Sequence, residues 1–351
     1  MPLPRPDLTG LPADVIAYVV MLEEELERLA ANVPQRRAPR ETDDLPAFPS
    51  EPPTTLNVVT ISAGGLAKRT PRHLYQRQRR GGIGVFDLDA PESERLSLSS
   101  AAFLTVADES DSLLLLTSKG RTFRLPVASL EESPVRSRGQ VITATAPLLA
   151  DERFACALPA RSSGYVTIVS ERGQVRRFGS HLFGEGMRPG TVLYDINYGG
   201  PPAAACWTTG EQDLLIATRM GNAIRFAERQ IPVRGCLGIR LDRDDIVTAA
   251  AGVTDADQVF LLGSDGRGAL RQMSGFRANK EPGAGGKQLM KTDAFVAAFA
   301  VEEQDDLFII SQLGKIIRFQ TVEVPVKEGV VQGVNCMELR SDRTVALTAS
   351  H

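Results

Sequence analysis

From residue 56 onward, short runs of Val, Ile, Leu and Thr alternate with turns that contain glycine. Apolar spacings of three and four residues, which mark an amphipathic helix, do not persist in this region. Residues 113–117 are a typical run, followed within three positions by Gly120. Runs of this length between turn residues are typical of β-strands. The pattern therefore predicts an all-β body over residues 56–351.

Two series of glycines divide this body into similar units, at intervals of about 50 residues. The first series is Gly65, Gly120, Gly173, Gly221, Gly266 and Gly314, and the second is Gly84, Gly139, Gly190, Gly238, Gly286 and Gly333. A unit of four short strands cannot bury both of its faces alone, whereas six units can close a ring. We therefore expect a six-bladed propeller-like fold, with approximate blades 56–100, 101–152, 153–202, 203–250, 251–299 and 300–351.

The first 55 residues differ from the body. Five apolar residues recur there at spacings of four and three, as in a coiled-coil helix: Val15, Val19, Leu22, Leu26 and Leu29. We expect a short helix within residues 1–32. A helix of this length needs a partner, either another copy, which would give self-association, or the body of the same chain. Residues 33–55 are rich in proline and predict an extended linker.

Composition excludes several classes of protein. The apolar runs are too short for a membrane-spanning helix, and the proline-rich start does not resemble a secretion signal, so we expect a cytoplasmic protein without membrane contact. The four cysteines are far apart and form no metal-binding motif, which favours a role as small buried side chains.

The net charge of −3 arises in residues 1–55, with 5 basic and 10 acidic residues. The body is therefore mildly basic.

Motifs for catalysis are absent. The glycines at 82–84 and 286 complete neither a dinucleotide-binding nor a phosphate-binding loop. The histidines are scattered, and no nucleophilic serine motif occurs. The acidic group Asp242, Asp244 and Asp245 is typical of a turn. We expect no metal, no cofactor and no enzymatic activity.

An arginine recurs four residues after each turn glycine, except in the fifth repeat, where it comes one residue later. These arginines are Arg69, Arg124, Arg177, Arg225, Arg271 and Arg318. One interpretation places them around the rim as a track for the phosphates of duplex DNA. The alternative is structural, because a residue fixed by a repeat can form ion pairs between blades. The pattern by itself favours neither.

A basic segment at residues 68–80 favours the DNA interpretation. It contains Lys68, Arg69, Arg72, Arg77, Arg79 and Arg80 and no acidic residue. The last two arginines lead into Gly81 and Gly82, where the absence of side chains lets a phosphate backbone approach closely. We therefore expect a DNA-binding patch at this segment.

At these residues the chain resembles the C-terminal domain of DNA gyrase A. Residues 78–84, QRRGGIG, match that family's QRRGGKG box at six of seven positions. The resemblance implies a six-bladed β-pinwheel whose neighbouring blades exchange strands and which wraps duplex DNA around its rim. It also implies that Gln78, Arg79, Arg80, Gly81, Gly82 and Gly84 help the first blade to meet the last and support wrapping. None of the five tyrosines follows an arginine, as the family's DNA-cleaving tyrosine does, so we expect no DNA cleavage.

Two departures from the family weaken the expected wrapping. Ile83 replaces the lysine of the box, and residues 301–351 contain 5 basic and 8 acidic residues. The leading hypothesis is sequence-independent binding and bending of duplex DNA at the nucleoid, either as an accessory to gyrase or topoisomerase IV subunits or as an architectural protein. The rival hypothesis is a protein-interaction disc that has lost DNA wrapping.

Overall fold

The computed structural model describes residues 51–89, 100–197 and 199–350, together with Val15, Val19 and Met21. Two units are distinguished, Met1–Ala47 and Phe48–His351. The three described residues of the first unit are helical, with Val15 and Met21 exposed and Val19 half-buried. The predicted apolar positions Leu22, Leu26 and Leu29 and residues 33–50 of the predicted linker lie outside the described residues. The domain boundaries stay a prediction.

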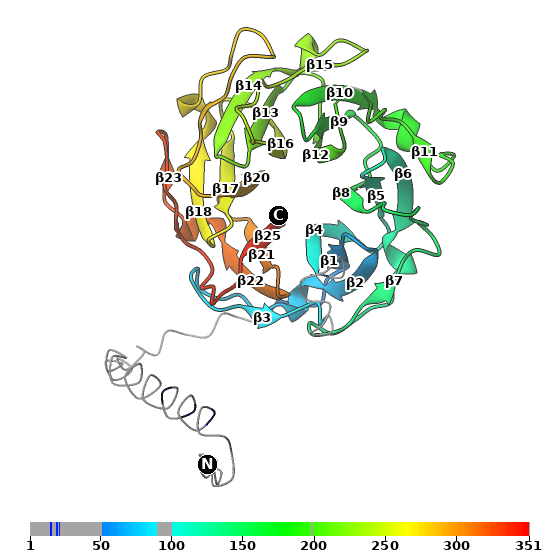
Figure 1. Cartoon of the computed structure of the whole chain (residues 1–351). Coiled ribbons are helices and arrows are strands. Elements are labelled where there is room, and N and C mark those ends of the chain that lie inside the picture. Colours follow the sequence, from blue (N-terminus) through cyan, green and yellow to red (C-terminus); the bar gives the residue numbers. More distant parts are fainter. Residues whose placement is uncertain are drawn as a thin grey trace. The chain divides into compact units, whose positions relative to one another are not determined.

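The second unit is a ring of six small β-sheets (Figure 1). In each repeat a hairpin is followed by a short 3₁₀ helix, a short outer strand and a longer inner strand. The hairpins are β1 (Leu56–Ser62) with β2 (Leu66–Pro71), β5 (Ser112–Thr117) with β6 (Arg121–Pro126), β9 (Tyr165–Ser170) with β10 (Gln174–Gly179), β13 (Asp213–Thr218) with β14 (Asn222–Ala227), β17 (Gln258–Gly263) with β18 (Arg267–Gln272), and β21 (Asp306–Ser311) with β22 (Lys315–Gln320). The 3₁₀ helices are η1 (Arg72–Leu74), η3 (Val127–Ser129), η4 (Ser180–Phe183), η5 (Glu228–Gln230), η6 (Met273–Gly275) and η7 (Thr321–Glu323).

The remaining strands form the outside and the centre of the ring. The outer strands are β3 (Val85–Phe86), β7 (Gln140–Val141), β11 (Thr191–Val192), β15 (Cys236–Leu237), β19 (Lys287–Gln288), β23 (Val326–Lys327) and β24 (Val334–Asn335). The inner strands are β4 (Ala101–Asp108), β8 (Phe154–Pro159), β12 (Pro202–Thr208), β16 (Val247–Val253), β20 (Phe295–Val301) and β25 (Thr344–Ser350). All pairings between these strands are antiparallel except that of β23 with β18.

Each repeat lends its outer strand to the sheet of the preceding blade. The first sheet, for example, has the order β4-β1-β2-β7, in which β7 comes from the second repeat. The sixth sheet has the order β25-β21-β22-β3, so the first repeat closes the ring on the last. This confirms the predicted pinwheel with strand exchange. Each blade therefore contains strands from two consecutive repeats, so its boundaries differ from those of a repeat in the sequence.

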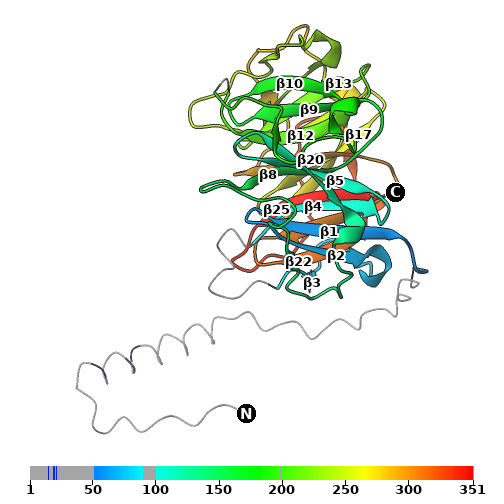
Figure 2. The ribbon, with the colours of Figure 1, turned by 90° about the vertical axis from the view of Figure 1, so that its right-hand side faces the viewer.

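The segment from each 3₁₀ helix to the end of its last outer strand is called a strap below. Straps 1 to 6 comprise residues 72–86, 127–141, 180–192, 228–237, 273–288 and 321–335. Each strap lies along the outer edge of the preceding blade, so the six straps form the rim. Figure 2 shows the same ring from the side, with the sheets stacked around its axis.

Burial explains why these residues form strands. The hairpin strands are covered on both faces, as in β5, where every residue is buried. The hydrophobic clusters join neighbouring blades: Val59 and Leu115 belong to one cluster, and Val58 and Phe308 of the first and last hairpins belong to another. No single sheet completes its own core, which is why the apolar runs recur six times.

The glycine pattern is confirmed for the first series, since all six have positive φ. In the second series one assignment is wrong. Strand register places Gly235, immediately before β15, in the position that Gly84 and Gly139 occupy before β3 and β7. Gly238 lies three residues beyond it. A glycine is needed at such a position, because a Cβ at Gly84 would lie 2.6 Å from the carbonyl oxygen of Ile316.

Candidate nucleic-acid interface

The recurring arginines do not lie exposed on the rim, as the phosphate-track interpretation requires. Arg69, Arg225, Arg271 and Arg318 are buried, and Arg124 and Arg177 are half-buried. The expectation of an exposed track at these positions is therefore wrong, and the structural alternative accounts for their recurrence.

Four of these arginines bind carbonyl groups at the end of a neighbouring 3₁₀ helix. Arg69 Nε donates to Leu130 O at 3.0 Å, and Arg124 Nη1 donates to Phe183 O at 3.0 Å. Arg225 Nη1 donates to Met273 O at 2.7 Å and to Phe276 O at 3.2 Å. Carbonyls at the C-terminal end of a short helix, such as those of Leu130, Phe183 and Phe276, have no partner within the helix, and a guanidinium group supplies a donor. Met273 O, at the start of η6, also accepts from Phe276 N. Each arginine thus holds the strap of the next repeat.

Arg318 makes the same contact across the closure of the ring. Its Nη1 donates to Tyr75 O at 3.0 Å, just after η1, and to Arg72 O at 3.1 Å, at the start of η1. Its Nη2 forms ion pairs with Asp306 and Glu51. Burial alone would raise the pKa of Glu51, but hydrogen bonds from Arg318 and Arg72 lower it below the usual 4.5.

Two arginines depart from this contact. Arg177 pairs with the carboxylate of Glu228, the first residue of η5, at 3.0 Å. Arg271 comes one residue late on its strand, so its side chain points to the opposite face, as alternation in a strand requires. There its Nη1 donates to Leu289 O at 2.6 Å. The irregular spacing in the sequence thus marks a different contact.

Most of the basic segment at residues 68–80 is also engaged within the protein. Lys68 is buried and pairs with Asp87 at 2.8 Å, and Thr60 donates to the other oxygen of the same carboxylate. Burial lowers the pKa of Lys68, an effect that the charge of Asp87 opposes. Arg72 pairs with Glu51, and Arg77 pairs with Asp306 at 2.8 Å. A direct role for Lys68 in DNA contact does not fit its burial.

The heptapeptide at residues 78–84 joins the first repeat to the sixth blade. Gln78 N donates to Arg318 O at 2.8 Å, and Gly81 N donates to Cys336 O at 2.7 Å. Arg80 is exposed, yet its Nε donates to Glu323 O at 2.8 Å. Arg79 and Ile83 are exposed. The structure therefore places this heptapeptide at the ring closure, while its contact with DNA stays a prediction.

The exposed cations of the rim lie on the straps, and sequence reasoning found only two of them. On the six straps the described residues include eleven exposed basic and five exposed acidic side chains. The basic ones are Arg79, Arg80, Arg136, Arg138, Arg188, Arg229, Arg234, Arg277, Lys280, Lys287 and Lys327. The other nine lie mostly in the segment between each hairpin and the second glycine of the repeat. Because this segment varies in length, the cations do not recur at a fixed spacing in the sequence.

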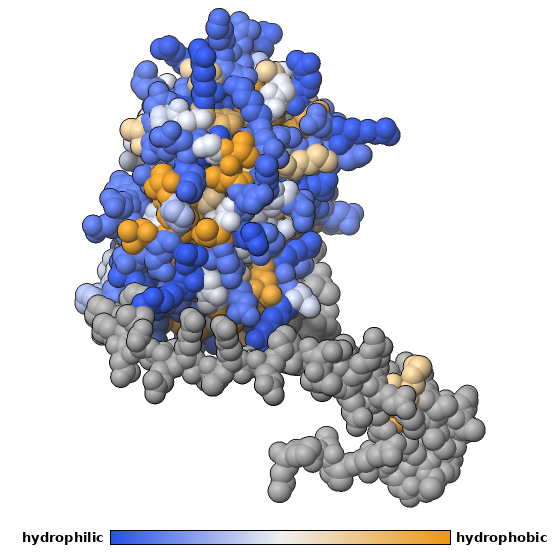
Figure 3. All heavy atoms as spheres, turned by 90° about the vertical axis from the view of Figure 1, so that its left-hand side faces the viewer, coloured by the Kyte–Doolittle hydropathy of each residue, from blue (hydrophilic) through white to orange (hydrophobic). Residues whose placement is uncertain are grey.

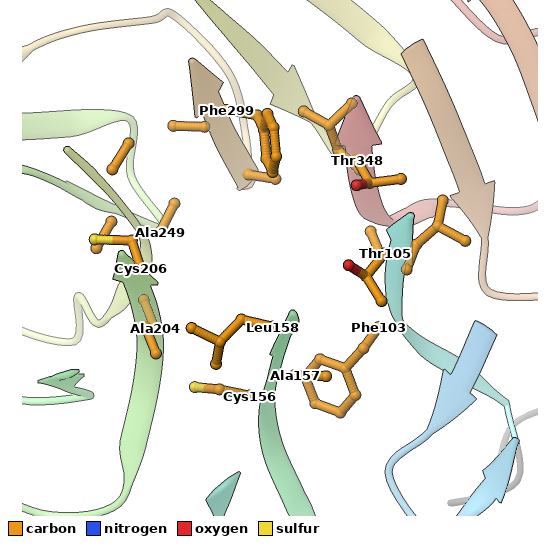
Figure 4. A pocket seen from close by; sticks show the side chains of 18 of the residues that line it. Phe103, Thr105, Cys156, Ala157, Leu158, Ala204, Cys206, Ala249, Phe299 and Thr348 are labelled. Carbon is orange, nitrogen blue, oxygen red and sulfur yellow. The ribbon is translucent and has the colours of Figure 1, made fainter. Parts of the chain in front are cut away.

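The centre of the ring is a different kind of surface. A channel of about 1310 Å³ is lined by the inner strands, with side chains such as Phe103, Phe299, Cys156 and Cys206 around it (Figure 4). Burial raises the pKa of both thiols to about 12, so they are weak nucleophiles at neutral pH. Among the described residues, no three His, Cys, Asp or Glu side chains gather to hold a metal ion.

Comparisons with known proteins agree with this geometry. The family model of the DNA gyrase C-terminal domain, a β-propeller, matches residues 56–97, 111–145, 212–253 and 305–327. DNA gyrase A from Kosmotoga olearia is 27% identical over 310 residues, and that from Chlamydia pneumoniae is 26% identical over 300 residues. These alignments cover 83% and 81% of this chain but 37% and 35% of the relatives. The chain thus spans little more than a third of the relatives' length.

Solved structures show the same fold. The DNA gyrase A C-terminal domain aligns with a TM-score of 0.73 and 18% identity over 84% of this chain and 99% of that one. The C-terminal domain of DNA topoisomerase IV aligns with a TM-score of 0.59 and 17% identity, over 85% and 94%. Six sheets, exchanged outer strands and a ring closed by the heptapeptide define a β-pinwheel. The body of this chain therefore resembles the DNA gyrase C-terminal domain in sequence and has the same fold.

Among the described helices, none has the length and apolar composition needed to cross a membrane.

Proposed function

We propose that the protein binds duplex DNA without sequence preference and bends it along the strap rim. The proposal rests on one observation, the excess of exposed cations on the straps. Off the straps, the exposed charged side chains of the described part of the ring are nearly balanced in sign, with ten basic and twelve acidic residues. A curved row of cations suits the regular phosphates of a duplex and makes no base contacts.

The similarity to the DNA gyrase C-terminal domain supports this proposal. The activity belongs at the nucleoid, next to gyrase or topoisomerase IV subunits, as an accessory that shapes DNA without cutting it. The cations are unevenly distributed, because strap 6 has only Lys327 as an exposed cation while strap 5 has three. Bending a short duplex costs on the order of 1–6 kcal/mol. The bent duplex is therefore held by the cations of straps 1 to 5, and its path along the rim is incomplete at strap 6.

Salt titration tests the proposal with a matched control. The double substitution Arg138→Gln, Arg188→Gln removes two exposed strap cations, and the slope of log affinity against log salt should become shallower by about 1.8. Arg243→Gln, Arg340→Gln removes the same charge from exposed positions off the straps. This control should leave the slope unchanged. Equal effects of the two pairs would show that the straps have no special role.

A second candidate function is supported by strap 6. Val322, Val326 and Val330 are 60%, 44% and 49% exposed there, where other straps carry arginine. The side of the molecule that includes β23 shows apolar patches between hydrophilic ones (Figure 3). Exposed apolar patches are typical of protein-interaction sites. A pull-down in which Val322→Ser, Val326→Ser loses a partner, with DNA affinity unchanged, would support a protein-docking role.

A further inference from the structure

Strap 4 has an unusual tip at residues 232–234. This strap is the shortest of the six, with ten residues from η5 to the end of β15. Val233 is 88% exposed, the highest value among the large apolar side chains of the described residues. Pro232 and Arg234 beside it are also exposed. A single exposed apolar side chain is common on protein surfaces, so the position of Val233 becomes informative only together with the turn that holds it and the cations beside it.

The tip is rigidly held. Gly235 N donates to Pro232 O at 2.8 Å and closes a tight turn, and Gly235 has a φ of 82°. A Cβ at Gly235 would lie 2.6 Å from Val175 O, so the turn is seated directly on β10. On its other side the strap begins at Glu228, which is fully buried.

Glu228 anchors the strap through a complete set of donors. Its carboxylate receives hydrogen bonds from Gly210 N at 2.7 Å and Gln212 N at 3.0 Å, and it pairs with Arg177. Ile231, the residue immediately before the tip, is 4% exposed and belongs to a core cluster. A tip fixed in this way loses little conformational entropy when a ligand covers it.

The charge around the tip suits a polyanion. Arg229 and Arg234 are exposed on the same strap, and strap 4 has no exposed acidic residue. Arg176 on the adjacent β10 is half-buried and adds a third positive charge near the strap. Proteins that bend DNA combine arginines with apolar side chains that enter the minor groove and partly unstack one base step. Such a kink lowers the cost of bending the rest of the duplex.

We propose that Pro232 and Val233 form a wedge that enters the minor groove of rim-bound duplex DNA and kinks it, with Arg234 alongside. This inference rests on the proposed DNA binding and adds a specific point of deformation to it. The wedge is uncharged, so it acts on the shape of the DNA and leaves the number of released counterions unchanged. It favours flexible pyrimidine–purine steps such as TA.

The test compares Val233→Ser with Val192→Ser, because Val192 is a rim valine with 60% exposure in the outer strand β11. A duplex of about 40 base pairs, four helical turns, with TA steps carries a fluorophore at each end. Energy transfer reports bending, and permanganate reactivity of thymine reports unstacking. Wild type and Val192→Ser should show enhanced reactivity at TA steps, and Val233→Ser should lose on the order of threefold in that enhancement and part of the bend.

The salt dependence separates this inference from the proposed function. Val233→Ser should keep the salt slope of wild type, whereas Arg234→Gln should reduce the slope by about 0.9. Binding by wild type without thymine reactivity, or equal reactivity in the two valine variants, overturns the wedge and leaves DNA binding intact. Absence of duplex binding by wild type overturns both. Thermal melting shows that each variant is folded, as expected for exposed positions.

Discussion

Replacing Arg318 by methionine tests whether the recurring arginines hold the ring together. Arg318 is 3% exposed, and its loss leaves the carbonyl groups of Arg72 and Tyr75 without this donor. It also removes ion pairs from Asp306 and from Glu51, of which Glu51 keeps Arg72. Breaking a buried ion pair costs about 3–5 kcal/mol, and Asp306 keeps Arg77, so the lower end applies. The lost hydrogen bond to Tyr75 O adds about 1 kcal/mol, and the one to Arg72 O adds less, because Arg72 O keeps Tyr75 N as a donor. We expect a loss of about 4–5 kcal/mol.

Arg69 provides a matched comparison at the equivalent position of the first blade. It donates to one carbonyl, that of Leu130, and its ion-pair partner Glu109 is 52% exposed. An exposed pair contributes about 0–1 kcal/mol and one carbonyl about 1 kcal/mol. Arg69→Met should therefore cost about 1–2 kcal/mol, roughly 3 kcal/mol less than Arg318→Met.

The assay is urea unfolding followed by circular dichroism and by the fluorescence of Trp207, the only tryptophan. DNA affinity is measured in parallel over a range of salt concentrations. The folded variants should keep the wild-type salt slope, because these arginines face the protein. Equal destabilisation by the two substitutions, or a slope that falls by about 0.9 in folded Arg318→Met, would contradict the reasoning.

Two further predictions concern the ring closure. Gly84→Ala should lower stability by about 2 kcal/mol or more, because φ is 68° and the new Cβ would lie 2.6 Å from Ile316 O. The control is Gly329→Ala, whose new Cβ would meet no atom within 4 Å and which should be near neutral. Both are measured by thermal melting. Glu51→Gln should destabilise the protein at neutral pH. Because the pKa of Glu51 is lowered in the folded state, its contribution is present above the unfolded value and is lost as the pH falls below 4.5. The difference from wild type should shrink in acid denaturation at low pH, and a constant difference would show that the charge is not responsible.

The sequence by itself determined the repeat architecture. Six apolar hairpins, each with a turn glycine at positive φ, are local features, and their period of about 50 residues predicts a ring regardless of side-chain contacts. The heptapeptide at residues 78–84 was also recognised from the sequence, and the structure places it at the expected junction of first and last repeats. These features could be predicted because each depends on a few neighbouring residues.

The tertiary structure decided which cations face solvent. Arg225 and Arg138 are both arginines of a repeat, yet Arg225 is 2% exposed and Arg138 is exposed. The difference arises because each strap lies along the preceding blade and places its 3₁₀ carbonyls over the hairpin arginine. A contact between residues about 50 positions apart leaves no local trace in the sequence, since recurrence looks the same for a structural clamp and a binding surface. The structural role of these arginines is seen only in the folded ring, where the exchange of outer strands brings each strap over a hairpin arginine.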